Sequence, residues 1–193
     1  MKQLYKVYLA SKSPRRKEIL KLMGIDFTVC DSNADENIPE RNPGLLVEAL
    51  SRRKAENCSI NEECIVIGAD TVVSYDNMIL GKPKDKEDAK RMLRLLSGQV
   101  SSVYTGVTLR FIGNNKPSVT FHTKSDVIFD ILSEREIDEY VASGEPMDKA
   151  GAYGIQGTFA KHIKGINGDF YNVMGLPMND LYKKMKEENV IFI

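Results

Sequence analysis

The distribution of apolar residues along the first half of the chain predicts strands and helices in alternation. The largely apolar run LYKVYLA at 4–10 predicts a buried strand. Ser13 then provides an N-cap and Pro14 a proline at the first helical position, so a helix is expected to run to about Met23 and to end at Gly24. This order of strand, cap and helix is typical of the units that build α/β proteins.

The same pattern continues along the chain. A short strand is expected at 26–30, and Asn42-Pro43 starts a second helix that reaches about Asn57. Residues 64–75, CIVIGADTVVSY, are β-rich with an expected break at Gly68-Ala69-Asp70. The remaining expected elements are strands at 78–80, 101–112 and 118–131 and helices at 86–97, 133–142 and 176–189. Because crossover helices and hairpins both occur, the predicted class is α/β, with a long mixed sheet flanked by helices.

The overall charge of the chain is balanced. It has 193 residues, with 27 lysines and arginines against 27 aspartates and glutamates, so the formal net charge is zero. This balance argues against a general nucleic-acid binder, which usually carries a basic excess, and against an acidic disordered protein. The length suits one large domain or two lobes that share a core, and no linker divides the chain, so a single domain over 1–193 is expected.

The cysteines and the N-terminal segment bear on the compartment. Cys30, Cys58 and Cys64 have no C-x-x-C spacing, and with only two histidines a zinc site is not expected. Their odd number suits a reducing compartment, where we expect them to remain thiols. No stretch approaches the roughly 18 apolar residues of a membrane span. The basic cluster follows the first apolar run, the reverse of a signal peptide, so the sequence predicts a cytoplasmic protein.

Several basic residues are candidates for binding phosphate. The segment Ser11-Lys12-Ser13-Pro14-Arg15-Arg16 lies between a predicted strand and the start of a helix, where free backbone N–H groups favour an anion. Two arginines and the hydroxyls add donors for phosphate oxygens. The alternative is an ordinary helix cap with solvated arginines. Lys82, between Gly81 and Pro83, and Lys54, on the second helix, are further candidates, with solvated surface lysines as the alternative.

Two other segments carry acidic and amide groups. Asp70 is expected at the C-terminal end of an apolar strand, where a carboxylate can hold Mg²⁺ or activate water; the alternative is a turn residue that bonds its own backbone. Residues 143–157 contain four glycines and predict a shaped loop, in which the amide of Gln156 can read a base edge. Glu145 and Asp148 in that loop either take part in the site or have a structural role, in which they bond to loop amides.

Seven segments, taken in order, resemble the Maf family of nucleoside triphosphate pyrophosphatases. They are LASKSPRRKEIL at 9–20, SRRKAE at 51–56, VIGADTVV at 66–73, GKPKDKEDAKRMLRLLSG at 81–98, VYTGV at 103–107, YVASGEPMDKAGAYGIQG at 140–157 and NVMGLPM at 172–178. The form DKAGAYGIQG is similar to the branch that acts on dTTP and UTP. Gln99 and Ser101 depart from the family pattern, which often has Arg and His at these places.

The resemblance implies a two-lobed fold with a central cleft, a divalent metal ion, Mg²⁺ or Mn²⁺, and hydrolysis between the α- and β-phosphates. The implied catalytic residues are Asp70, Glu36, Lys54 and Lys82. Asp70 is then the general base or a metal-linked carboxylate, and Glu36 is the second acidic group near the metal. The implied substrate-binding residues are Ser11, Arg15, Arg16, Thr71 and Gln156. Of these, Arg15, Thr71 and Gln156 match positions that the resemblance links to base selectivity.

Two functional hypotheses follow. The first is a metal-dependent pyrophosphatase for dTTP and UTP, with modified pyrimidine nucleotides as further substrates and a house-cleaning role. The second is a regulator of septum formation that binds nucleotide without turnover, and the presence of both Asp70 and Glu36 counts against it. A single-strand nucleic-acid binder ranks last, because the chain has no tryptophan and no aromatic residues interleaved with its basic ones. No membrane partner is expected, and the resemblance alone suggests a homodimer.

Overall fold

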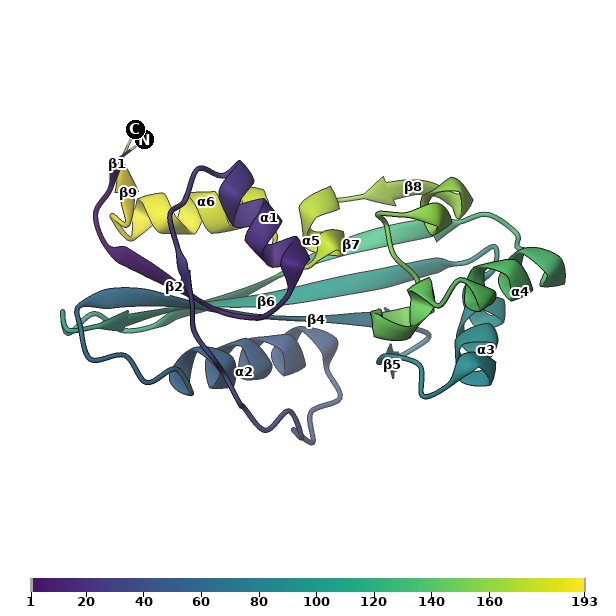
Figure 1. The fold of residues 1–193 in the computed structure, drawn as a ribbon, viewed down its shortest axis with the longest axis horizontal. Coiled ribbons are helices and arrows are strands. Elements are labelled where there is room, and N and C mark those ends of the chain that lie inside the picture. The colour runs from purple at the N-terminus through teal and green to yellow at the C-terminus, as the bar shows by residue number, and fades with distance from the viewer. Residues whose placement is uncertain (1, 193) are drawn as a thin grey trace.

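A mixed β-sheet with two long central strands organises the molecule (Figure 1). The structure is a computed structural model that describes residues 2–192. In it β4 (Cys64–Tyr75) and β6 (Val100–Ile112) run antiparallel, in register from Cys64 opposite Ile112 to Ser74 opposite Ser102. The order of the main path is β3-β2-β4-β6-β7-β8, and β5 also pairs with β4. The other strands are β2 (Lys6–Ala10), β3 (Thr28–Val29), β5 (Met78–Leu80), β7 (Val119–Phe129), β8 (Ile163–Asn167) and the separate pair β1 (Lys2–Gln3) and β9 (Ile191–Phe192).

Helices cover both faces of the sheet. The helix α2 (Pro43–Glu56) lies on one face, and α1 (Pro14–Leu22), α5 (Phe170–Met174) and α6 (Met178–Glu187) lie on the other (Figure 1). The helices α3 (Lys86–Leu96) and α4 (Glu134–Ala142) pack at the far end of the long strands. This arrangement confirms the predicted α/β class with a long mixed sheet.

Two buried clusters of apolar side chains make up most of the core. The first packs α1 and α6 against β2, β4 and β6, with Leu20, Ile67 and Leu181 among its fully buried members. The second packs α3 and α4 with Phe159 against the other half of the long strands. Burying apolar area in this way is the main favourable contribution to folding. None of the helices within residues 2–192 is long and apolar enough to span a membrane.

The helix starts predicted from the sequence have the expected physical basis. The side chain of Asn42 accepts hydrogen bonds from the backbone N–H groups of Gly44 and Leu45, so it satisfies two of the unpaired donors of α2. Ser133 and Glu136 form the reciprocal capping box of α4. Ser13 is the N-cap of α1 by position, but its side chain makes no capping hydrogen bond.

The expected break in the strand at Gly68-Ala69-Asp70 is wrong, because β4 continues through these residues. The glycine serves a close approach of α2 instead. A Cβ atom on Gly68 would lie 2.1 Å from the carbonyl oxygen of Ser51, and one on Gly106 would lie 2.2 Å from that of Val47. The backbone of α2 therefore rests directly on the sheet. Asp70 is accordingly within the strand rather than at its C-terminal end.

Replacing Gly68 with alanine is expected to lower stability markedly. The added methyl group cannot fit without moving α2 away from β4, and overpacking of this kind costs about 1–3 kcal/mol. Urea unfolding of Gly68→Ala measures the loss. Gly81→Ala is a suitable control, because a Cβ atom there meets nothing within 4 Å. Equal midpoints for the two variants would contradict the inferred close packing.

The expectation that all three cysteines remain thiols is also wrong in this structure. Cys30 and Cys58 form a disulfide with a Cα–Cα distance of 6.1 Å, and Cys64 is a buried free thiol. The sequence gives no sign of this pair because its members are 28 residues apart and meet only through the fold. The bond joins the residue after β3 to a residue just beyond α2. The closed ring contains both Glu36 and Lys54.

Candidate active site

A gap between two strands along one edge of β4 defines the candidate site. On this side β2 pairs with β4 as far as Ala10 opposite Gly68, and β5 pairs with β4 only from Val73 onward, where Leu80 lies opposite Val73. Residues 69–72 of β4 have no strand neighbour on that side within residues 2–192. A cavity of about 690 Å³ lies there. Small-molecule sites typically have volumes of roughly 300–1,000 Å³, so the cavity can take a ligand the size of a nucleotide.

The cavity brings together most of the residues singled out from the sequence. Of the nine, all but Ser11 line it: Arg15, Arg16, Glu36, Lys54, Asp70, Thr71, Lys82 and Gln156. They come from α1, the segment before α2, α2 itself, β4, the segment after β5 and the loop at 143–157. Ser11 lies next to the cavity, where its Oγ accepts a hydrogen bond of 3.1 Å from Nη1 of Arg16.

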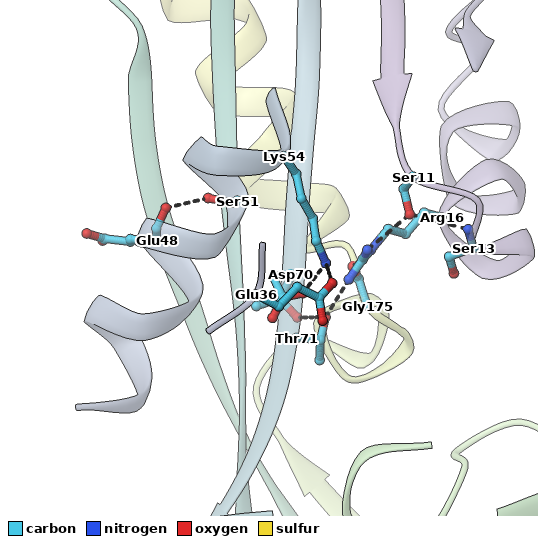
Figure 2. A network of polar contacts seen from close by, with 11 residues as sticks. Ser11, Ser13, Arg16, Glu36, Glu48, Ser51, Lys54, Asp70, Thr71 and Gly175 are labelled. Carbon is cyan, nitrogen blue, oxygen red and sulfur yellow. Dashed lines mark hydrogen bonds and ion pairs between the residues drawn. The ribbon is translucent and has the colours of Figure 1, made fainter. Parts of the chain in front are cut away.

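An ammonium group flanked by two carboxylates lies at the centre of the site (Figure 2). Nζ of Lys54 is 2.6 Å from Oδ1 of Asp70 and 2.8 Å from Oε1 of Glu36. The side chains of Lys54 and Asp70 are each only 14% exposed, so Lys54 is not a solvated lysine on an outer helix face. The hydrogen bond from Lys54 holds the pKa of Glu36 below its usual range. The close approach of α2 at Gly68 is what brings Lys54 within reach of β4.

The two arginines of α1 have different environments. The guanidinium of Arg16 donates from Nε to the carbonyl of Gly175 at 2.8 Å and from Nη2 to Oγ1 of Thr71 at 3.1 Å, as well as to Ser11 (Figure 2). Burial lowers the pKa of Arg16. Arg15 is freer: its side chain is 34% exposed and its Nη1 lies 3.5 Å from a carboxylate oxygen of Asp148. Arg16 is therefore held rigidly and is not a solvated arginine.

Asp70 and Thr71 point to opposite faces of the sheet, as neighbours in a strand must. Asp70 meets Lys54 on the face covered by α2, whereas Thr71 meets Arg16 on the other face. Behind Thr71, its Oγ1 lies 3.0 Å from Oγ1 of Thr105, which donates to the carbonyl oxygen of Asn172 at 2.9 Å. Sequence reasoning missed Thr105 and Asn172 in this role, although both fall inside the segments VYTGV and NVMGLPM.

The loop at 143–157 supplies one wall of the cavity and contains short 3₁₀ turns. Its first two turns are Glu145–Asp148 and Ala150–Ala152, and a third, Thr158–His162, follows. The carboxylate of Glu145 accepts hydrogen bonds from N and Oγ1 of Thr158, which supports the structural alternative for Glu145. Asp148 instead pairs with Arg15 and with Lys149.

The two departures from the family pattern do not line the cavity, although Ser101 contacts Tyr153, which does. Ser101 is fully buried, and its hydroxyl lies 3.2 Å from the phenolic oxygen of Tyr153. Gln99 follows α3, and its backbone carbonyl accepts a hydrogen bond from the N–H of Phe129. Neither side chain is among those that line the cavity.

The acidic residues in the cavity are few but suited to a divalent cation. No group of three or more His, Cys, Asp or Glu side chains is placed to hold a metal ion within residues 2–192. Glu36 and Asp70 both form ion pairs with the ammonium group of Lys54, so their carboxylates are close together. Mg²⁺ is commonly held by one or two carboxylates and completed by substrate phosphates and water. The donor set therefore fits such an ion when it arrives with a phosphate ligand.

Fold and site together define a class: an α/β protein with an edge cleft whose charges suit a polyphosphate. A solved structure described as a HAM1 protein from Coxiella burnetii shares the fold, with a TM-score of 0.53 over 95% of this chain and 100% of that chain at 13% identity. The family model described as "Maf-like protein" matches residues 6–188. The chain belongs to the Maf family.

Relatives with curated names are similar to nearly the whole of this chain. A protein of Agathobacter rectalis named dTTP/UTP pyrophosphatase is 50% identical, over 95% of this chain and 98% of the relative. Proteins with the same name from Lachnoclostridium phytofermentans and Bacillus cytotoxicus are 50% and 48% identical, again over nearly the whole of both chains. The similarity therefore extends through every segment that lines the cavity.

Proposed function

We propose that this protein is a nucleoside triphosphate pyrophosphatase. It hydrolyses the bond between the α- and β-phosphates of dTTP and UTP, and modified pyrimidine nucleotides are further substrates. The observation that carries the proposal is the cluster of Lys54, Asp70 and Glu36 in a cavity that Arg15 and Lys82 also line. Cations stabilise a triphosphate and its departing pyrophosphate, and carboxylates serve water activation. The names of the relatives support this hydrolase over a regulator of septum formation that leaves nucleotide intact.

In the proposed mechanism Asp70 accepts the proton of the water that attacks the α-phosphorus. A buried carboxylate held by Lys54 at 2.6 Å is well oriented for this role, because its rotation is restricted. Lys82 and Arg15 stabilise the negative charge that develops on the leaving pyrophosphate. Arg16, whose guanidinium is fixed by three hydrogen bonds, holds the cleft wall and offers its remaining N–H groups to the phosphates.

We also propose that a divalent metal ion, Mg²⁺ or Mn²⁺, takes part, held by Glu36 and Asp70. When bound, such an ion polarises phosphate oxygens and offsets their negative charge. Lys54 keeps the two carboxylates together, and it holds Glu36 in the ionised form that a metal ligand requires. Removal of the metal with a chelator should therefore abolish turnover.

The base is proposed to bind at the side of the cavity formed by the loop at 143–157. Thymine and uracil share an O4 and N3–H edge that cytosine lacks, and an amide such as Gln156 can test it. Arg15 and Thr71 are the other residues to which we assign base selectivity. All three line the same cavity. A site with hydrogen-bonding groups rejects a mismatched base more strongly than an apolar pocket does.

We propose a cytoplasmic enzyme that acts on free nucleotides rather than on nucleic acid or a membrane. The two core clusters are interpreted as two lobes of a single domain, and a homodimer is proposed from the family resemblance.

A disulfide is unusual in a reducing compartment, so the redox state of Cys30 and Cys58 bears directly on the proposed localisation. Counting free thiols by mass spectrometry, with and without reductant, determines it.

A pyrophosphate-release assay tests the proposed function. Purified protein is incubated with each canonical nucleoside triphosphate and with modified pyrimidine triphosphates, in Mg²⁺, in Mn²⁺ and with chelator. The expected result is metal-dependent release of pyrophosphate and monophosphate, fastest from dTTP and UTP. Release of inorganic phosphate and a nucleoside diphosphate would indicate cleavage between the β- and γ-phosphates instead. No release from any nucleotide would leave only the non-hydrolytic alternative.

A further inference from the structure

A chain of hydrogen bonds behind the cavity wall fixes the direction in which the hydroxyl of Thr71 points its proton. One end of the chain is the guanidinium of Arg16, whose Nη2 is 3.1 Å from Oγ1 of Thr71 and can only donate. The other end is the carbonyl oxygen of Asn172, which can only accept and lies 2.9 Å from Oγ1 of Thr105. Between these ends, the two threonine hydroxyls are 3.0 Å apart.

Only one arrangement of protons satisfies all three contacts. Thr105 has a single hydroxyl proton, and the contact with the carbonyl of Asn172 uses it. The contact between the two threonines then requires the proton of Thr71, so Thr71 donates to Thr105 and accepts from Arg16. A hydroxyl oxygen has two lone pairs, of which Arg16 takes one. Thr71 therefore presents a single free lone pair and no proton to the cavity.

We propose that Thr105 is a positioning residue for base selectivity, because it keeps Thr71 in this acceptor-only state. Thr105 is fully buried and does not line the cavity, whereas Thr71 does. The partner of an acceptor must donate. Phosphate oxygens of a triphosphate are acceptors, so they are unsuited to this lone pair. Thymine and uracil donate from N3–H, whereas N3 of cytosine is an acceptor and would meet lone pair with lone pair.

The sugar hydroxyls are the other hydrogen-bond donors of dTTP and UTP, and the named substrates of the relatives argue against the 2′-hydroxyl. Those names join a deoxyribonucleotide, dTTP, with a ribonucleotide, UTP, which share the N3–H edge but not the 2′-hydroxyl. Both carry a 3′-hydroxyl, so the 3′-hydroxyl is distinguished from N3–H by the analogue experiment below. The inference rests on the proposed function and deepens it, since it assigns a mechanism to the choice between pyrimidine bases.

The test is to replace Thr105 with valine, which keeps the shape and removes the hydroxyl. Thr71 then loses its acceptor and is free to turn its proton into the cavity. We expect the ratio of kcat/KM for dTTP to that for dCTP to fall at least about tenfold. Thr105→Ser retains the hydroxyl and should restore the ratio. An unchanged ratio in Thr105→Val would overturn the inference while leaving the pyrophosphatase activity itself standing.

Thr108→Val is the matched control. Thr108 lies on the opposite face of the same strand, is equally buried, and has its hydroxyl 2.8 Å from that of Ser51 and 2.9 Å from that of Thr120. Its loss should lower stability without changing the ratio of dTTP to dCTP. A similar fall of the ratio in both variants would indicate general loosening of the sheet and overturn the proposal.

Two measurements on the unaltered protein keep the test valid if Thr105→Val does not fold. The triphosphate of 3-methylthymidine lacks N3–H and should be a poor substrate, whereas dideoxythymidine triphosphate lacks the 3′-hydroxyl and should be hydrolysed nearly as well as dTTP. The opposite order would assign the lone pair of Thr71 to the sugar and overturn the inference. No turnover of dTTP itself would instead contradict the proposed function.

Discussion

Replacing Asp70 with asparagine is expected to lower kcat for dTTP by about 10³-fold or more, near the upper range for loss of a general base. Asparagine has nearly the same shape but cannot accept the proton of the attacking water. It also removes the negative charge that faces Lys54 at 2.6 Å. Steady-state pyrophosphate release measures the effect, and circular dichroism checks that the fold is retained.

Asp126→Asn is the matched control for that experiment. Asp126 lies on β7, accepts a hydrogen bond from Ser102 and pairs with Lys124, but it does not line the cavity. Its conversion to the amide should leave kcat within about twofold, as expected for a site outside the reacting groups. Retention of more than a tenth of the activity by Asp70→Asn would rule out Asp70 as the base.

The substitution Lys54→Met is expected to have the second largest effect, a fall in kcat of about 10²–10³-fold, comparable to the loss of one stabilising donor in an active site. Methionine keeps much of the length of the side chain and removes its charge. Glu36 and Asp70 then face each other without a cation between them, so we expect the pKa of Glu36 to rise. Steady-state kinetics with dTTP over a range of metal concentrations measures the change.

Lys90→Met provides a control with similar local geometry. Lys90 also bridges two carboxylates, at 2.7 Å from Asp138 and 3.5 Å from Glu87, but on the outer side of α3 and α4. Both carboxylates are more than half exposed, and surface ion pairs of this kind contribute little, so both activity and stability should change only slightly. If Lys54→Met is as active as Lys90→Met, the central ammonium group has no part in the reaction.

Local sequence signals predicted much of the fold because they act over a few residues. The Asn42 cap of α2 and the Ser133 capping box of α4 are complete within one helical turn. The strand expected at 78–80 follows a short turn in which Asp76 and Asn77 have the positive φ values that such hairpins require. The element β8 and the short helix α5 were not predicted. Each has only five residues, and each is held by contacts with β7 or β6 that are distant in the sequence.

Gly68 shows where a local signal was misleading. A glycine inside an apolar run suggests a break, and only the position of α2 reveals that its lack of a side chain serves packing. The disulfide between Cys30 and Cys58 was not predicted for a similar reason, since the fold alone brings the two residues together.

The candidate site was predicted unevenly for a related reason. Residues such as Lys54, Lys82 and Asp70 carry charges that stand out in a sequence, and the family resemblance supplied their joint role. Thr105 and Asn172 are uncharged and act through a proton order that depends on three interatomic distances. No pattern of residue types encodes such distances, so these positions became visible only with the structure.

The open interval of β4 at residues 69–72 has a consequence for the behaviour of the protein in solution. An unpaired strand edge is a template on which other chains can add and aggregate. This interval spans only about 13 Å at the usual rise per residue, and β2 and β5 border it at either end. Most strands are longer, about 5–6 residues. The protein can therefore leave backbone open to a small ligand while denying another polypeptide enough length to pair.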